Sequence, residues 1–98
     1  MGQPITVSAA TVEGDIAAFD TDRSITGQDG ATFGSAQDAA DAGSIPGDLA
    51  GRLFDADYAV GHVFIASNQV VVGRSGGWDD AALAASTRIV TNFFVFYD

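Results

Sequence analysis

The single histidine of the chain, His62, is the first residue to consider for chemistry. An imidazole can bind a metal ion or act as a general base near neutral pH. The sequence offers it no cysteine, no second histidine and no Ser/Glu constellation, and there is no lysine to serve as a nucleophile. We therefore expect no catalytic residues and no enzyme. His62 is interpreted as a structural or surface residue, with metal ligation as the alternative.

Two carboxylates, Asp55 and Asp57, lie two positions apart at the end of a predicted helix. Such a pair could hold a hard cation on a loop, but no EF-hand spacing surrounds it. Asp-x-Asp also arises by chance in an acidic chain. His62, Asp55 and Asp57 are thus the metal candidates, and the sequence predicts neither a bound metal nor another cofactor.

A glycine-rich stretch, Gly73–Gly77, precedes the last predicted helix and resembles a phosphate-binding loop in its position. It contains no lysine and no G-x-x-x-x-G-K-[ST] pattern. Asp79 and Asp80 follow directly, where they would repel an anion and favour the helix dipole. We predict a plain connection between a hairpin and a helix.

Large aromatic side chains give the best sequence sign of a binding surface. Trp78, at a predicted helix start, is interpreted as a lid over the edge of the core, with a partner-binding anchor as the alternative. The segment Phe93–Tyr97 is too apolar for one helical face to bury. The candidate partner-binding residues are Trp78, Phe94, Phe96 and Tyr97.

Alternating or β-branched runs predict the strands that position these residues. Ile5–Ala9 and Ile16–Phe19 form one predicted hairpin, and Ala31–Phe33 adds a brief extended segment. Val60–Arg74 is the strongest strand signal and predicts a second hairpin. In its turn Asn68 is expected to take the left-handed conformation.

Capping and 3.6-residue periodicity predict three helices. Ser35 and Asp38 have capping-box spacing before a helix over Ala36–Ala42, and Pro46 suits the first turn of the next. The third runs from Trp78 or Asp79 to about Phe94. The order β-β-α-α-β-β-α predicts an α+β fold in two layers, an antiparallel sheet with helices on one face. The predicted core includes Leu53, Phe54, Phe64, Ile65, Val71, Ile89 and Phe93.

Composition limits the class of protein. The 98 residues suit a single domain over the whole length, and no apolar run is long enough to span a membrane. The start of the chain lacks the features of a signal peptide, so we expect a cytoplasmic protein. Without cysteine, disulfides and thiolate-bound clusters are excluded. Four scattered arginines make no basic face for nucleic acid.

The net charge of −9 comes from 12 Asp and one Glu against four Arg. One interpretation is a surface adapted to high salt, where repulsion between carboxylates is screened. The alternatives are ordinary drift of the composition toward acidic residues, and an acidic nucleic-acid mimic or inhibitor. The acids are spread singly and form no block longer than Asp79–Asp80. The first interpretation is preferred.

Four segments in order carry a family resemblance. Phe33–Ala40 is similar to F-x-x-A-x-x-A-A, Ile45–Phe54 to S-P-L-A-x-x-L-F with two residues inserted, and Val63–Val72 to V-F-F-G-x-D-F-I-T-V. Trp78 then opens a helix that ends in a paired aromatic. Together they resemble the N-terminal domain of Nfu-type (NifU-like) iron–sulfur scaffold proteins, which also occurs free-standing. The family's T-P-N-P-N-x-L-K-F segment appears here only as Thr11–Phe19, without its Pro, Asn and Lys residues, and the family's Cys-x-x-Cys belongs to a separate domain.

The resemblance implies a non-enzymatic interaction or accessory module whose partners are proteins of iron–sulfur cluster assembly. The alternatives are a small acidic iron- or metal-binding accessory protein and, further, a nucleic-acid mimic. We expect a monomer or weak homodimer that binds neither nucleic acid nor membrane. The open sheet face and the C-terminal segment Phe94–Tyr97 are the expected contact elements.

Overall fold

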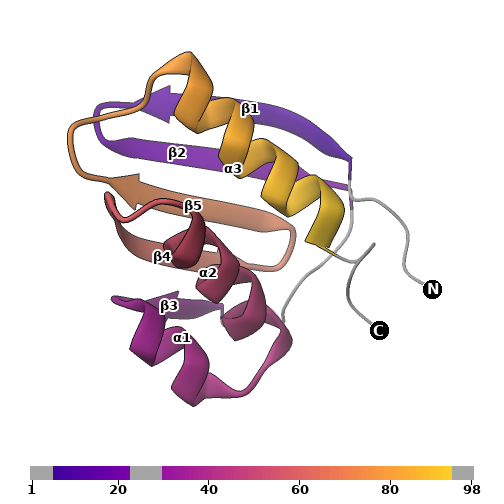
Figure 1. The fold of residues 1–98 in the computed structure, drawn as a ribbon. Helices are drawn as coiled ribbons and strands as arrows, with labels where there is room; N and C mark the ends of the chain where they lie inside the picture. Colours follow the sequence, from indigo (N-terminus) through magenta and orange to yellow (C-terminus); the bar gives the residue numbers. More distant parts are fainter. Residues whose placement is uncertain (1–5, 23–29, 94–98) are drawn as a thin grey trace.

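The computed structural model describes residues 6–22 and 30–93. Within these ranges it is an α+β fold of two layers, a five-stranded sheet with three helices packed on one face (Figure 1). The predicted fold class is confirmed. The strands are β1 (Val7–Glu13), β2 (Ile16–Thr21), β3 (Ala31–Phe33), β4 (Val60–Ala66) and β5 (Gln69–Arg74). The helices are α1 (Ala36–Ala42), α2 (Ile45–Ala56) and α3 (Asp80–Asn92).

The strand order in the sheet is β1-β2-β5-β4-β3, and every neighbouring pair is antiparallel. The hairpin β1–β2 therefore lies beside β5, the last of the described strands (Figure 1). Asn68 and Thr21 join these parts: the Thr21 N–H and hydroxyl both donate to the Asn68 carbonyl, at 2.9 and 2.8 Å. The Asn68 side-chain amide donates back to the Thr21 carbonyl at 2.9 Å.

One face of the sheet, here called the inner face, is covered by the helices. Its side chains alternate along each strand with those of the opposite face, as the strand period requires. Phe19 and Val70 face each other across β2 and β5, and both are fully buried. The largest fully buried side chains are Phe19, Phe93, Leu49, Leu53, Ile65, Val63, Val70, Val72 and Val90.

Each helix begins at a side-chain cap. Ser35 accepts a hydrogen bond from the Asp38 N–H, as the capping-box spacing predicts, and Ser44 accepts one from Gly47. Asp79 caps α3 by accepting from the Ala82 N–H at 2.7 Å. A capping residue satisfies backbone donors that the first helical turn leaves without partners. These local signals explain why the helix starts were predictable.

Helices α1 and α2 pack closely because residue 47 is glycine. A Cβ atom there would lie 2.7 Å from the Ala39 carbonyl oxygen, a backbone atom. Gly51, one turn later, has more room, since the nearest atom to its Cβ position is the Ala39 Cβ at 3.9 Å. Gly47 thus sets the distance between the two helices.

Several predicted details are wrong. The core prediction holds for Leu53, Phe54, Ile65 and Phe93, which are buried. Phe64 and Val71 are only half-buried, because both lie on the face of the sheet opposite the helices. Ile89 is also half-buried, since α3 turns Ser86, Val90 and Phe93 toward the sheet.

Turn and strand boundaries also differ from prediction. Ser67, with φ of 54°, takes the left-handed position expected for Asn68. Asn68 instead uses its backbone and side chain to bind Thr21. Strand β1 continues to Glu13, and Ala31–Phe33 is a full strand, so the order is β-β-β-α-α-β-β-α. Among the described residues, no helix is long and apolar enough to cross a membrane.

Candidate functional site

The outer face of the sheet, opposite the helices, carries a row of side chains across all five strands. Opposed residues of neighbouring strands point to the same face. The pairings run Thr11–Ala18, Ala18–Val71, Val71–Phe64 and Phe64–Thr32. Ala18, Val71 and Phe64 are half-buried at the centre, while Thr11 and Thr32 are exposed at the two ends. The row therefore presents an apolar centre between polar edges.

Polar groups flank this row. On one side Asp20 lies opposite Gln69, and the Gln69 amide donates to the Asp20 carboxylate at 3.0 Å. On the other side the polar groups are His62 and Glu13, which lie at the two ends of a line that runs through Gly73 and the apolar Ile16. The outer face thus has the apolar centre and polar rim found in protein–protein interfaces.

His62 is exposed on this face beside Gly73. Its ring occupies the space that a Cβ at residue 73 would need, so a larger residue at this position of β5 would displace the imidazole. The ring also lines a shallow hollow of about 490 Å³ together with Asp15, Arg74 and other residues of the sheet end. Across residues 6–22 and 30–93, no group of three or more His, Asp or Glu is placed to hold a metal ion.

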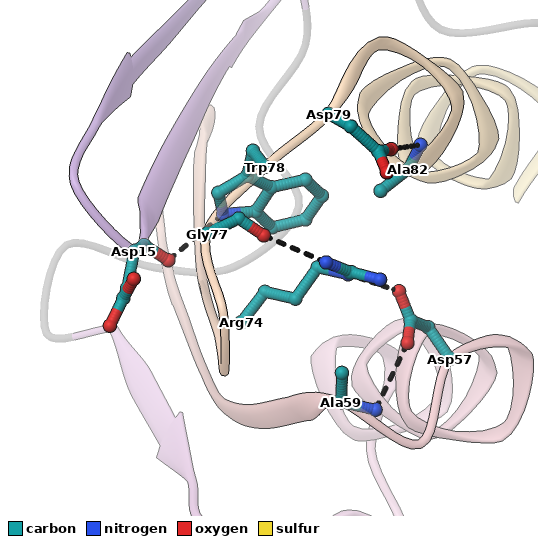
Figure 2. Close-up of polar contacts among 8 residues, drawn as sticks. All are labelled: Asp15, Asp57, Ala59, Arg74, Gly77, Trp78, Asp79 and Ala82. Atoms are coloured by element: carbon teal, nitrogen blue, oxygen red, sulfur yellow. Dashed lines mark hydrogen bonds and ion pairs between the residues drawn. The ribbon is translucent and has the colours of Figure 1, made fainter.

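Asp57 is engaged in a polar network rather than facing open solvent (Figure 2). Arg74 donates from Nε to Asp57 Oδ2 at 2.6 Å and from Nη1 to the Gly77 carbonyl at 2.8 Å. The Ala59 N–H donates to Asp57 Oδ1 at 3.0 Å. The hydrogen bond from Arg74 lowers the pKa of the Asp57 carboxyl, and the same bond raises the pKa of Arg74.

This network joins three segments: the end of α2, the end of β5 and the connection to α3 (Figure 2). Asp57 therefore has a structural role at the C-terminal cap of α2. Asp55 remains exposed on α2. The structure does not bring Asp55, Asp57 and His62 together as a metal-binding group. Within the stretch Gly73–Gly77, predicted as a connection, Gly73 and Arg74 still belong to β5, and the connection to α3 begins at Ser75, with Gly76 and Gly77 at positive φ.

Trp78 closes the end of the core between the β1–β2 turn and α3. Its indole Nε1 donates to the Asp15 carbonyl at 2.9 Å (Figure 2). Its ring meets Phe19 edge to face, with centroids 6.2 Å apart and planes at 79°. The polar end and the apolar body of the ring are both used inside the fold, as in the predicted lid. Phe94, Phe96 and Tyr97 lie outside the described residues.

Two features were not anticipated from the sequence. Tyr58, in the turn between α2 and β4, is 100% exposed. Its turn is held against the β5–α3 connection, because the Ser75 N–H donates to the Ala59 carbonyl at 2.8 Å. Arg52 places its guanidinium carbon 5.1 Å from the Phe93 ring centroid, a cation–π contact between α2 and the end of α3. Neither residue belongs to a local sequence motif.

Comparison with known proteins gives no match to this chain, whether with family models, with curated proteins or with solved structures.

Proposed function

We propose that this chain is a non-enzymatic protein-interaction module that docks on its partner through the outer face of the sheet. The observation that carries the proposal is the apolar row of Ala18, Val71 and Phe64, which none of the described helices covers. A half-buried apolar centre with a polar rim gains free energy when a partner removes it from water.

The partners proposed are proteins of iron–sulfur cluster assembly. This part of the proposal is supported by the resemblance of the segments from Phe33 to Phe94 to the Nfu-type N-terminal domain. The chain has no cysteine, so it cannot hold a cluster through thiolates of its own. It would act beside a protein that does. A cytoplasmic location is part of the proposal and agrees with a chain that forms no disulfides.

The placement of the polar side chains favours an interaction role over metal binding. Asp57 is paired with Arg74, and Asp79 caps a helix. His62 is not accompanied by further ligands among the described residues. Of the side chains that could bind a metal, Asp57 and Asp79 are therefore engaged in structural contacts, and His62 has no further ligand beside it among the described residues.

The test is calorimetric titration of this protein with a purified Nfu-type Cys-x-x-Cys domain. Val71→Lys places a charge at the centre of the outer face, and Ala40→Lys makes the same change in charge on exposed α1. We expect micromolar binding that weakens at least tenfold in Val71→Lys and is unchanged in Ala40→Lys, because a buried unpaired charge is costly. No binding of the domain contradicts the iron–sulfur assignment, and equal binding by both variants contradicts the docking face.

A second titration, with ferrous iron and with zinc, examines the metal-binding alternative. We expect no micromolar binding by the wild-type protein. Micromolar binding that disappears in His62→Ala would replace the interaction module with a metal-binding accessory role.

A further inference from the structure

Among residues 6–22 and 30–93, no strand pairs with the outer side of β1 or of β3, so these two strands form the edges of the sheet. The two edges differ in length, since β1 has seven residues and β3 has three. A free edge presents backbone N–H and C=O groups that can pair with a further strand. Only β1 is long enough to form a stable additional ladder.

The hydrogen-bond pattern shows which groups of β1 point outward. Glu13 and Ile16 flank the two-residue turn of the hairpin, so Glu13 and alternate residues before it bond to β2. The phase is confirmed on β2, where Asp22, in alternation with Ile16, Ala18 and Asp20, donates its N–H to the Thr6 carbonyl; the bulge between Val7 and Ala9 accounts for the one-residue shift on β1. It follows that the backbone groups of Ala10 and Val12 point away from the sheet.

From Ala9 to Val12 the outward side of β1 lacks the charges and prolines that normally protect an edge strand, although a bulge, another protective feature, lies before Ala9. Between Val7 and Val12 it has no lysine, no proline and no charged residue, and Glu13 alone is charged. Val12 is 41% exposed although it lies on the inner face with Ala17. A bulge lies between Val7 and Ala9, which leaves Ala9–Glu13 as the regular part of the strand.

We propose that two copies of this chain pair through β1, antiparallel and centred on Thr11, to make one continuous sheet. In this register Ala10 lies opposite the second copy's Val12, so the outward backbone groups meet and the exposed Val12 gains an apolar neighbour. Thr11 lies opposite Thr11, a favourable cross-strand pair. Ala9 lies opposite Glu13, so no like charges face each other.

The charge of the chain makes this pairing dependent on salt. Each copy carries −9, and the two Glu13 residues of a pair are four residues apart along the ladder, about 14 Å. That separation exceeds the Debye length of ~10 Å at 0.1 M salt, so repulsion comes mainly from the total charge of the two copies. Pairing is weak in dilute buffer and strengthens at molar salt.

The absence of cysteine allows a direct test by cross-linking. Opposed residues at a non-hydrogen-bonded antiparallel position have Cα atoms about 4.5 Å apart, within the range for a disulfide. We expect Thr11→Cys to form a disulfide-linked dimer under mild oxidation in 2 M potassium chloride. Thr32→Cys is the matched control, because Thr32 is exposed on the same face of the opposite edge strand. Equal cross-linking of the two variants, or none in Thr11→Cys, overturns the proposal.

Sedimentation velocity gives a second readout without cysteine. We expect the wild-type protein to show a dimer fraction that grows with concentration and with salt. Val12→Pro removes an outward N–H and should abolish the dimer, whereas Val12→Ala keeps that N–H and should retain it. Circular dichroism checks that the variants fold. A wild-type protein that stays monomeric at millimolar concentration in 2 M salt overturns the proposal even if Val12→Pro fails to fold.

Discussion

The two faces of the sheet are built from the same strands but have different surroundings. On the inner face Phe19 and Val70 are fully buried beneath the helices. One residue away along each strand, Ala18 and Val71 are half-buried on the outer face. The apolar runs of β4 and β5 supply both faces. The apolar residues that these strands place on the outer face, outside the core, are therefore the clearest sign of a second apolar surface.

Charge is distributed as unevenly as burial. The solvent side of the helical layer carries exposed carboxylates from all three helices: Asp38, Asp41, Asp48, Asp55 and Asp80. The outer face carries Asp20, which is bonded to Gln69, and the exposed Glu13, which lies opposite Ile16. The helical side therefore has more exposed carboxylates than the outer face, so a partner that meets the sheet faces fewer negative charges.

The largest expected effect comes from a substitution in the buried core of the inner face. Phe19→Ala removes a fully buried ring and its contact with Trp78, and should lower the free energy of unfolding by about 3–5 kcal/mol. Phe64→Ala on the outer face should cost roughly 1 kcal/mol, because its ring is already partly in water. Urea unfolding monitored by circular dichroism measures both. Equal costs would mean that the outer face is part of the core.

The next largest expected effect concerns the packing of α1 on α2, two of the helices that cover the inner face. Gly47→Ala should destabilise by about 1–3 kcal/mol, since its Cβ would press on the Ala39 carbonyl. Gly51→Ala should stabilise by up to ~1 kcal/mol, because alanine favours the helix and meets no atom closer than 3.9 Å. The same urea titration measures the change in the free energy of unfolding in both variants. Changes of the same sign in the two variants would contradict the proposed packing of α1 on α2.

A third prediction concerns pH and the Asp57–Arg74 network, which joins the end of α2 to β5 and to the connection before α3. Because the pKa of Asp57 is lowered in the fold, its ion pair with Arg74 contributes stability above the unfolded pKa of about 4. That contribution is lost as pH falls through the lowered folded pKa. Asp57→Asn keeps the shape without the charge, so the wild type should be more stable at pH 6 and the difference should shrink as the pH falls below about 4. A constant difference in melting temperature across this range would exclude a role for the charge.

The smallest expected effect concerns the exposed carboxylates on the helical side of the molecule. Melting temperature should rise between dilute buffer and about 1 M potassium chloride, because screening reduces repulsion among carboxylates. Asp55→Asn removes a negative charge near the C-terminal end of α2 and should stabilise by ~0.3–1 kcal/mol in dilute buffer. The gain should disappear at high salt. A midpoint that falls with salt would show that attractive pairs through arginine outweigh the repulsion.

Much of the fold was predictable because its signals are local. Ser35 with Asp38, Pro46 in the first turn of α2 and the hairpin within Val60–Arg74 each depend on a few adjacent residues. The assignment of faces was not predictable in the same way. Continuous apolar runs such as Val63–Ile65 do not reveal which residues point inward, and the pairing of distant strands decides it.

The site was less predictable than the fold for the same reason. Asp57 and Arg74 are 17 positions apart, and Trp78 reaches Asp15 across 63 positions. No periodicity connects such residues. The outer row from Thr11 to Thr32 likewise exists only through the order of the strands. Residue types suggested the lid role of Trp78, but only the topology shows what it covers.

The strand order also has a consequence for synthesis on the ribosome. The β1–β2 hairpin ends at Thr21, but its neighbour β5 ends only at Arg74. At ~5–20 residues per second, the hairpin waits roughly 3–10 s before its partner strand is made. An isolated two-stranded hairpin is marginally stable in water. We therefore expect the β1–β2 segment to stay largely unpaired until β5 has been made, and a chaperone that holds this segment during synthesis should raise the yield of folded protein.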